Sequence, residues 1–287
     1  MGFPMARRLL AAGFPLRAWN RTRSKAEPLQ TSNAVIADSA AEAATGADIV
    51  ITMLEAGPVV RSVLREIRDI LSPGTLVIDM SSTGQSEALE FKQLLSERSI
   101  KFIDAPVSGG VIGAEAGTLA IMAGADDAAD FFHAEPVLSV MGRPTRVGPV
   151  GSGQLAKLCN QLIVGGTLGI VAEALLLAQA GGADPAAVRA AIRGGFAESR
   201  ILEVHGQRML DRNFLPGGQV KSQAKDMENV LLAAAAAGLQ LPISELMTTA
   251  YRALLDVVPE ADQSAALLQL ERLNPGKRLG SAEDKLP

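Results

Sequence analysis

Hydrophobic and polar positions divide the chain into two regions of different texture. Up to about residue 105, short apolar runs are separated by segments whose apolar positions recur at helical spacing. Because these runs are continuously apolar, they are typical of parallel strands covered on both faces by helices. The pattern predicts a doubly wound α/β domain, with strands at 15–19, 35–37, 47–54, 75–80, 101–105 and 120–123 and helices at 4–12, 24–30, 40–45, 59–71 and 85–97.

From residue 151 onward the chain is rich in Ala and Leu and has few β-branched runs. We expect an all-α second domain, because Gly and Pro clusters that end helices punctuate this region. These clusters lie at 181–182, 194–195, 216–218 and 238. The Gly-rich stretch 146–153 places the boundary between domains 1–150 and 151–287, and the polar tail after Asn274 is expected to be loosely held.

Composition narrows the possible partners. The 287 residues are 48% hydrophobic, which is ample for a buried core, and carry 27 Lys and Arg against 31 Asp and Glu, a net charge of −4. No basic surface for nucleic acid is implied. One cysteine and two histidines provide no disulfide and few ligands for a metal, which fits a cytoplasmic protein without a metal site. We expect Cys159 to be an inert core thiol.

The longest apolar stretch, residues 162–178, is interrupted by Glu173 and contains three glycines. It lacks flanking basic clusters, so a buried helix is favoured over a membrane span. The first ten residues carry charge and have helical spacing, which does not resemble a signal peptide. No membrane partner is expected.

The beginning of the chain bears on nucleotide binding. A doubly wound nucleotide-binding domain normally opens with a strand and a G-x-G-x-x-G turn, of which Gly2 could be the last glycine. About twenty residues on, where such folds recognise the ribose, the chain has Asn20, Arg21 and Thr22. Asn20 offers no carboxylate to repel a 2′-phosphate, while Arg21 and Arg23 offer positive charge, so NADP is favoured over NAD.

Two other groups of residues suggest a substrate site. Lys157, Asn160 and Gln161 have i, i+3 and i+4 spacing, so one ammonium and two amides would share a helix face. In an arbitrary sequence, such residues are more often a solvated helix surface. The segment 108–110, Ser-Gly-Gly, follows a short strand and could turn backbone N–H groups toward a carboxylate, although a plain strand-end turn has the same composition.

Several segments, taken together and in order, resemble the β-hydroxyacid dehydrogenases, which include 3-hydroxyisobutyrate dehydrogenase and tartronate semialdehyde reductase. They are GFPMA at 2–6, DAPVSGG at 104–110, GAEAGTL at 113–119, GSGQLAKLCNQ at 151–161 and KD at 225–226. The resemblance covers nearly the whole chain. It departs at the start, because members carry roughly ten more residues that form the first strand. We therefore expect that the natural chain begins upstream of Met1.

The resemblance implies a Rossmann-like fold and a role for each motif. Lys157 would be the catalytic acid and base, Ser108, Gly109 and Gly110 would bind the acid group of the substrate, and Asn160 and Gln161 would hold its other oxygens. The residues implied to bind the cofactor, NADP or NAD, are Gly2, Asn20, Arg21, Thr22, Met53, Leu54, Ser82 and Lys225. Family members pair through their helical domains, so a homodimer or homotetramer is expected.

The implied activity is NAD(P)-dependent interconversion of a short 3-hydroxy acid and its semialdehyde. Segments 194–205 and 211–214 look closest to tartronate semialdehyde reductases. Open alternatives are a 3-hydroxyisobutyrate or succinate-semialdehyde-type dehydrogenase, an imine reductase, and a non-catalytic relative. Lys157 argues against an imine reductase, and retention of Lys157 and the carboxylate loop argues against a non-catalytic relative.

Overall fold

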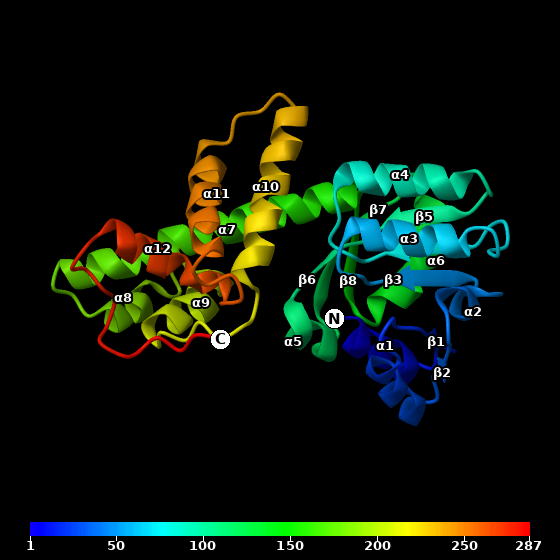
Figure 1. Cartoon of the computed structure of the whole chain (residues 1–287), viewed down its shortest axis with the longest axis horizontal. Helices are drawn as coiled ribbons and strands as arrows, with labels where there is room; N and C mark the ends of the chain where they lie inside the picture. The colour runs from blue at the N-terminus through cyan, green and yellow to red at the C-terminus, as the bar shows by residue number, and fades with distance from the viewer. The chain divides into compact units, whose positions relative to one another are not determined.

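A computed structural model describes residues 1–287, which divide into two compact units, Met1–Lys157 and Leu158–Pro287. The N-terminal unit contains all of the strands, and the C-terminal unit is helical (Figure 1). The predicted combination of an α/β domain and an all-α region is confirmed.

The main sheet of the N-terminal unit has six strands: β3 (Ile49–Thr52), β4 (Leu76–Asp79), β5 (Lys101–Asp104), β6 (Val107–Ser108), β7 (Leu119–Gly124) and β8 (Gly142–Gly148). The strands β3, β4 and β5 are parallel, as their continuous apolar runs predict. Two later strands reverse direction, since β7 is antiparallel to β5 and β8 is parallel to β7. The sequence pattern did not reveal β8, because most of its residues are exposed.

Helices cover both faces of this sheet. Helices α3 (Gly57–Ile67) and α4 (Gln85–Ser96) pack with Val77 and Phe102 on one face. On the other, α1 (Gly2–Ala11) and α6 (Ala128–Ser139) pack with Leu76, Ile78 and Ile103. Neighbouring residues of β4 therefore enter opposite cores, which confirms the doubly wound arrangement. A short helix, α5 (Gly110–Ala116), follows β6.

The strands β1 (Arg17–Ala18) and β2 (Val35–Ile36) form a separate two-stranded parallel sheet. The helix predicted at 24–30 is instead two 3₁₀ segments, η1 (Arg23–Lys25) and η2 (Glu27–Ser32). Pro28 lies in the first turn of η2 and lacks a backbone N–H, which disfavours a continuous α-helix through this segment. Ser39 caps the next helix, α2 (Ala40–Ala44), by accepting a hydrogen bond from the Glu42 N–H.

A long helix, α7 (Ser152–Ala180), leads into the helical unit. It is followed by α8 (Pro185–Ile192), α9 (Arg200–Leu210), α10 (Val220–Ala236), α11 (Pro242–Leu255), η3 (Gln263–Ala265) and α12 (Ala266–Leu273). Helices α7, α8 and α10 end within two residues of the predicted clusters at 181–182, 194–195 and 238, whereas α9 ends six residues before the cluster at 216–218. Gly182 and Gly238 adopt φ of +84° and +68°, which glycine reaches without strain.

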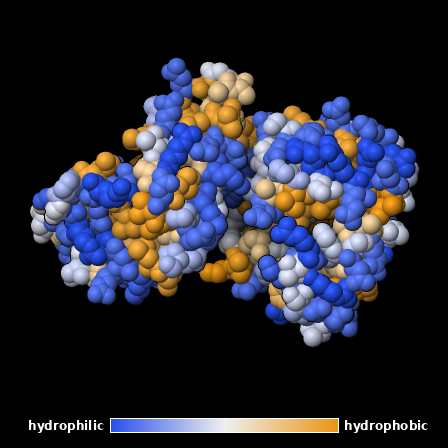
Figure 2. All heavy atoms as spheres, viewed as in Figure 1, coloured by the Kyte–Doolittle hydropathy of each residue, from blue (hydrophilic) through white to orange (hydrophobic).

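One face of α7 is buried and another is exposed. Leu168, Val171 and Leu175 enter the core of the helical unit, whereas Ile163, Ile170 and Leu177 are 61%, 60% and 73% exposed. Apolar side chains are visible on the surface of this unit in Figure 2. The expectation of a buried helix thus holds for one face only. Helix α7 is long and apolar enough to cross a membrane. Core helices of soluble proteins also reach this length and hydropathy.

The C-terminal tail is held more firmly than expected. Arg212, only 1% exposed, donates two hydrogen bonds to the Glu271 carboxylate, at 2.7 and 2.9 Å, and a third to the Leu279 carbonyl at 2.9 Å. It also pairs with Asp284 near the end of the chain. The expectation of a loosely held tail was wrong, because it considered the polarity of the tail and not its buried partner.

Candidate active site

The predicted residues of the first two loops lie at the carboxyl ends of β3 and β4. Leu54 is the second residue after the end of β3. Its N–H donates to Oγ of Ser81, the residue before Ser82, at 2.9 Å. Below this bond, Asp79 Oδ1 accepts from Thr52 Oγ1 at 2.7 Å. The loops that carry Leu54 and Ser82 are therefore tied together by the strand-end polar groups.

Gly2 and Met53 are also brought together. Helix α1 begins at Gly2, and a Cβ built there would lie 3.7 Å from the Met53 Cβ. The first turn of α1 contains no acidic residue. An anion is favoured at such a helix terminus by the exposed N–H groups and the helix dipole.

The loop after β1 carries Asn20, Arg21 and Thr22. The Thr22 N–H donates to Asn20 Oδ1 at 2.9 Å, which closes a local turn. Arg21 is exposed and forms no ion pair, whereas Arg23 pairs with Asp38 and Glu27. Of the two arginines on which the expectation of NADP rests, Arg21 has no acidic partner, whereas the charge of Arg23 is balanced by two carboxylates.

The predicted carboxylate loop turns sharply between β6 and α5. Ser108 ends β6, and Gly109 and Gly110 adopt φ of +137° and +64°. A Cβ at Gly109 would lie 3.1 Å from a methyl carbon of Leu119. Both the backbone conformation and the close packing require glycine at 109.

Asp104, at the end of β5, caps the start of α7. Its Oδ1 accepts from the Gly151 N–H and its Oδ2 from the Gln154 N–H, both at 2.7 Å. Gly153 is needed for this approach, because a Cβ there would lie 2.4 Å from the Asp104 carbonyl oxygen. A strand-end carboxylate thus satisfies N–H groups that lack partners within the helix.

The side chain of Gln154 links the same helical turn to the loop after β4. Its Nε2 donates to the Ser81 carbonyl at 2.8 Å, and its Oε1 accepts from the Thr83 N–H at 3.0 Å. Ser82 lies between these two bonded residues, and Lys157 lies three residues beyond Gln154. The sequence offered no sign of the role of Gln154 or of the capping role of Asp104, although both belong to the motifs at 104–110 and 151–161.

Asp79 and Asp104 are buried carboxyl groups in paired positions of β4 and β5. Burial raises the pKa of Asp79 to about 6, against hydrogen bonds from Ser81 and Thr52 that lower it. Burial likewise raises the pKa of Asp104 to about 7, opposed by the backbone bonds from Gly151 and Gln154. Two groups beneath the predicted cofactor edge therefore titrate near neutral pH.

In the helical unit the structure brings Asn160, Gln161 and Lys225 into one polar network. Asn160 Nδ2 donates to Gln161 Oε1 at 2.8 Å, and Gln161 Nε2 donates to Asp226 Oδ2 at 2.8 Å and to Gln223 Oε1 at 3.2 Å. Lys225 Nζ lies 3.5 Å from Asp226 Oδ1. Asp226 and Gln223 were missed as site residues, and only the Lys225-Asp226 pair gave a signal in the sequence.

The single cysteine and the two histidines lie outside these groups of polar residues. Cys159 is exposed on α7 rather than buried, so the expectation of a core thiol was wrong. His205 lies 3.2 Å from the buried Asp262, and His133 is exposed. No group of three or more His, Cys, Asp or Glu is placed to hold a metal ion.

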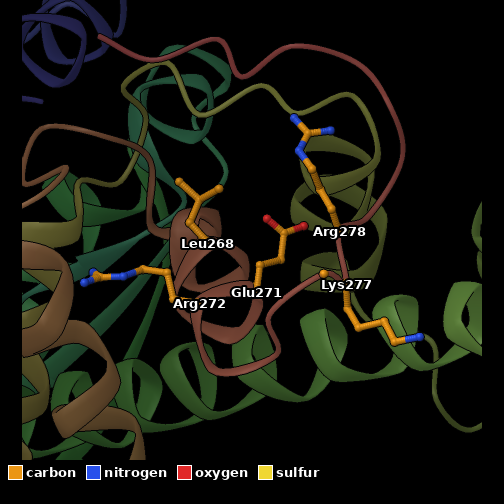
Figure 3. A pocket seen from close by; sticks show the side chains of 6 residues that line it. Leu268, Glu271, Arg272, Lys277 and Arg278 are labelled. Atoms are coloured by element: carbon orange, nitrogen blue, oxygen red, sulfur yellow. The ribbon is translucent and has the colours of Figure 1, made fainter.

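A pocket in the helical unit contains none of the predicted site residues (Figure 3). It is lined by Leu268, Glu271, Arg272, Gly276, Lys277 and Arg278. The Glu271 carboxylate is bonded to Arg212, and Arg278 donates to the carbonyl oxygens of Gly280 and Ala282. This pocket belongs to the packing of the tail.

The doubly wound unit and its strand-edge residues define a dinucleotide-binding oxidoreductase, and comparison with known proteins identifies its family. Residues 1–159 match the NAD binding domain of 6-phosphogluconate dehydrogenase, and residues 151–270 match the NAD-binding family of NADP-dependent 3-hydroxyisobutyrate dehydrogenase. The chain belongs to the NAD(P)-dependent β-hydroxyacid dehydrogenases.

Individual relatives share this family but carry different names. The chain is 41% identical to 2-hydroxy-3-oxopropionate reductase of Escherichia coli K12, over 84% of each chain. It is 34% identical to NAD-dependent L-serine dehydrogenase of Pseudomonas aeruginosa, over 89% of each. The structure of Mycobacterium tuberculosis 3-hydroxyisobutyrate dehydrogenase with L-serine matches with a TM-score of 0.86 and 30% identity, covering 94% of this chain and 95% of that one.

Proposed function

We propose that this protein is a cytoplasmic reductase that interconverts 2-hydroxy-3-oxopropionate (tartronate semialdehyde) and the corresponding 3-hydroxy acid, with NADP favoured over NAD. The 41% identity to a 2-hydroxy-3-oxopropionate reductase supports this substrate, and the exposed, unpaired Arg21 supports NADP. In this proposal Lys157 is the catalytic residue.

The anchored start of α7 is the observation that carries the proposal. Asp104 and Gln154 bond the first turn of this helix to the ends of β5 and β4, where ligands bind in such sheets. Lys157 lies less than one further turn along α7. A general acid must be held in a defined position, and the anchored first turn of α7 holds the backbone next to Lys157 in such a position.

Lys157 donates a proton to the carbonyl oxygen of the semialdehyde during reduction and accepts the hydroxyl proton during oxidation. The Ser108–Gly110 turn supplies a hydroxyl and backbone N–H groups for the substrate carboxylate. Asn160 and Gln161 hold the other substrate oxygens through their amides.

The residues of the N-terminal unit fit a nicotinamide dinucleotide. The start of α1 at Gly2 has no acidic residue in its first turn and suits a diphosphate, and Arg21 offers a cation for a 2′-phosphate. When bound, the cofactor supplies or accepts the hydride. The residues of this unit proposed to bind it are Gly2, Asn20, Arg21, Thr22, Met53, Leu54 and Ser82. Lys225 of the helical unit is proposed as a further cofactor-binding residue.

L-Serine is a second candidate substrate. Two comparisons favour it, the identity to an L-serine dehydrogenase and the match to a structure solved with L-serine. L-Serine carries a carboxylate and a 3-hydroxyl group, so Lys157 and the Ser108–Gly110 turn would serve it in the same roles.

A substrate and cofactor screen tests the proposal. The kcat/KM would be measured for the semialdehydes of tartronate, methylmalonate and succinate and for cyclic imines with NADPH and NADH, and for L-serine with NADP and NAD. We expect the highest kcat/KM for 2-hydroxy-3-oxopropionate with NADPH. A higher value for L-serine or an imine would contradict the substrate assignment, and no turnover with any compound would contradict the activity.

A further inference from the structure

We propose that Gln223 is a positioning residue that holds the Gln161 amide in place, in the direction that Asp226 sets, and thereby fixes the orientation in which the Asn160 amide meets the substrate. This inference rests on the proposed role of Asn160 and Gln161 in holding substrate oxygens. It adds a residue of α10 that no motif of the sequence pointed to.

The direction of the network follows from its last member, Asp226. An ionised carboxylate only accepts hydrogen bonds, so Gln161 must turn its Nε2 toward Asp226 Oδ2, at 2.8 Å. Gln161 Oε1 then faces Asn160, which must donate to it from Nδ2, at 2.8 Å. One N–H of the Asn160 amide is thus engaged within the protein, which fixes the orientation of this amide, and its second N–H and Oδ1 remain for a ligand.

Gln223 holds the middle of this network at two points. Its Oε1 accepts from Gln161 Nε2 at 3.2 Å, and its Nε2 donates to the Gln161 backbone carbonyl at 3.2 Å. Gln161 Nε2 has two N–H groups, and Asp226 and Gln223 accept one each. Because Gln223 is only 1% exposed, water does not readily replace it in these bonds.

Gly165 makes the approach of Gln223 possible. It lies four residues after Gln161 on α7, and a Cβ there would lie 2.6 Å from Gln223 Nε2 and 2.7 Å from Met227 Sδ. Its neighbour Gly166 has no such contact, because a Cβ there would lie 3.8 Å from an Ile243 methyl carbon. Alanine is therefore tolerated at 166, whereas at 165 it displaces the Gln223 amide.

Two variants remove the Gln223 contacts by different routes, and each has a matched control. Gly165→Ala displaces the side chain, with Gly166→Ala as its control on the same helix. Gln223→Met keeps the length of the side chain but removes its polar atoms, with Gln219→Met as its control, since Gln219 bonds to Glu260 outside the network. If one variant fails to fold, the other still tests the proposal.

Steady-state kinetics give the first measurement. We expect Gly165→Ala and Gln223→Met to raise the KM for the 3-hydroxy acid by about 3- to 10-fold, the effect of one weakened hydrogen bond, with kcat and the KM for the nucleotide nearly unchanged. The double variant should be no worse than either single one, since both remove the same contact. The controls should behave as the wild type.

A second measurement does not depend on activity. In the ¹⁵N NMR spectrum of the protein, the Asn160 side-chain NH₂ signal, assigned by its loss in Asn160→Asp, should be that of a bonded amide. It should move to the position of a solvated asparagine in Gly165→Ala and Gln223→Met but not in the controls. If the signal and the KM are unchanged in both variants, the positioning role is wrong. Lack of turnover by the wild type would instead contradict the proposed function, while the NMR result still decides the role of Gln223.

Discussion

Asp104 and Gln154 are joined by a hydrogen bond of 2.7 Å, in which the Gln154 backbone N–H donates to Oδ2 of Asp104. This bond connects the carboxyl end of β5 to the first turn of α7 across 50 positions of sequence. Lys157 follows on the same helix. The sheet edge that is proposed to bind the cofactor therefore also fixes the start of the helix that carries the proposed catalytic residue. The carboxylate that does this is fully buried.

The burial of Asp79 and Asp104 predicts a pH dependence of stability. Their pKa values, about 6 and about 7 in the folded chain, lie above the ordinary value of 3.8, so between pH 4 and 7 the folded chain binds protons that the unfolded chain has released. The contribution of these two groups to the free energy of unfolding therefore falls as the pH rises through this range and stays constant above it. Urea denaturation at pH 5 and pH 8 measures the difference.

Asp104→Asn isolates the contribution of one carboxyl group. The variant should lose about 1 kcal/mol at pH 5, because an amide oxygen replaces only one of the two accepting oxygens of the cap. It should also lose less stability than the wild type between pH 5 and pH 8, since no proton is released at this position. An identical pH dependence in the two proteins would contradict the raised pKa of Asp104.

The ion pairs near β1 predict which arginine recognises the phosphate of NADP. Arg21→Ala should weaken NADPH binding by about tenfold or more and NADH binding little, since a charge-assisted hydrogen bond to phosphate is worth roughly 1.5–3 kcal/mol. Arg23→Ala is the matched control, because Arg23 is already paired with Asp38 and Glu27. Fluorescence titration with both nucleotides measures the dissociation constants, and equal losses for NADPH and NADH would contradict the preference.

The buried contacts of Arg212 predict that the C-terminal tail contributes to stability. Arg212→Met leaves Glu271 and Asp284 without their common cation and should lower the free energy of unfolding by about 3–5 kcal/mol. Arg200→Met breaks an exposed pair with Glu203 and should cost less than about 1 kcal/mol. Similar losses in the two variants, measured by urea denaturation, would contradict this difference.

The exposed apolar face of α7 supports the prediction of a homodimer or homotetramer. Ile163, Ile170 and Leu177 recur at seven-residue intervals and are mostly exposed in the single chain. Light scattering should give a mass of two or four chains at micromolar concentration, and Ile170→Asp should shift it toward one chain. A wild-type mass of one chain would contradict the prediction.

The parts of the fold that sequence predicted are those set by local pattern. Continuous apolar runs located β3, β4 and β5, and glycines located the ends of α7 and α10. The mostly exposed β8 gave no apolar run, and the segment 24–30 was predicted as an α-helix although Pro28 favours 3₁₀ structure. These differences arise where pairing or backbone chemistry outweighs side-chain pattern.

The candidate site shows the same division. Sequence motifs pointed to Asn160, Gln161 and Lys225, which the structure brings into one network, while the role of Lys157 stays a prediction. Gln223 lies in no motif, and Gln154 lies within the motif at 151–161 without any sign of its role. Their partners are 62 and 71 or more positions away, and only the folded chain brings them together. Arg212 was missed for the same reason.

The central claim is that Lys157 transfers the proton during reduction. Turnover of Lys157→Ala with the best substrate of the screen, together with NADPH binding by fluorescence titration, tests it most directly. We predict that kcat falls by about 10²- to 10⁴-fold, the usual range for loss of a general acid, while the dissociation constant for NADPH stays unchanged. Turnover equal to that of the wild type, with NADPH still bound, would contradict the account.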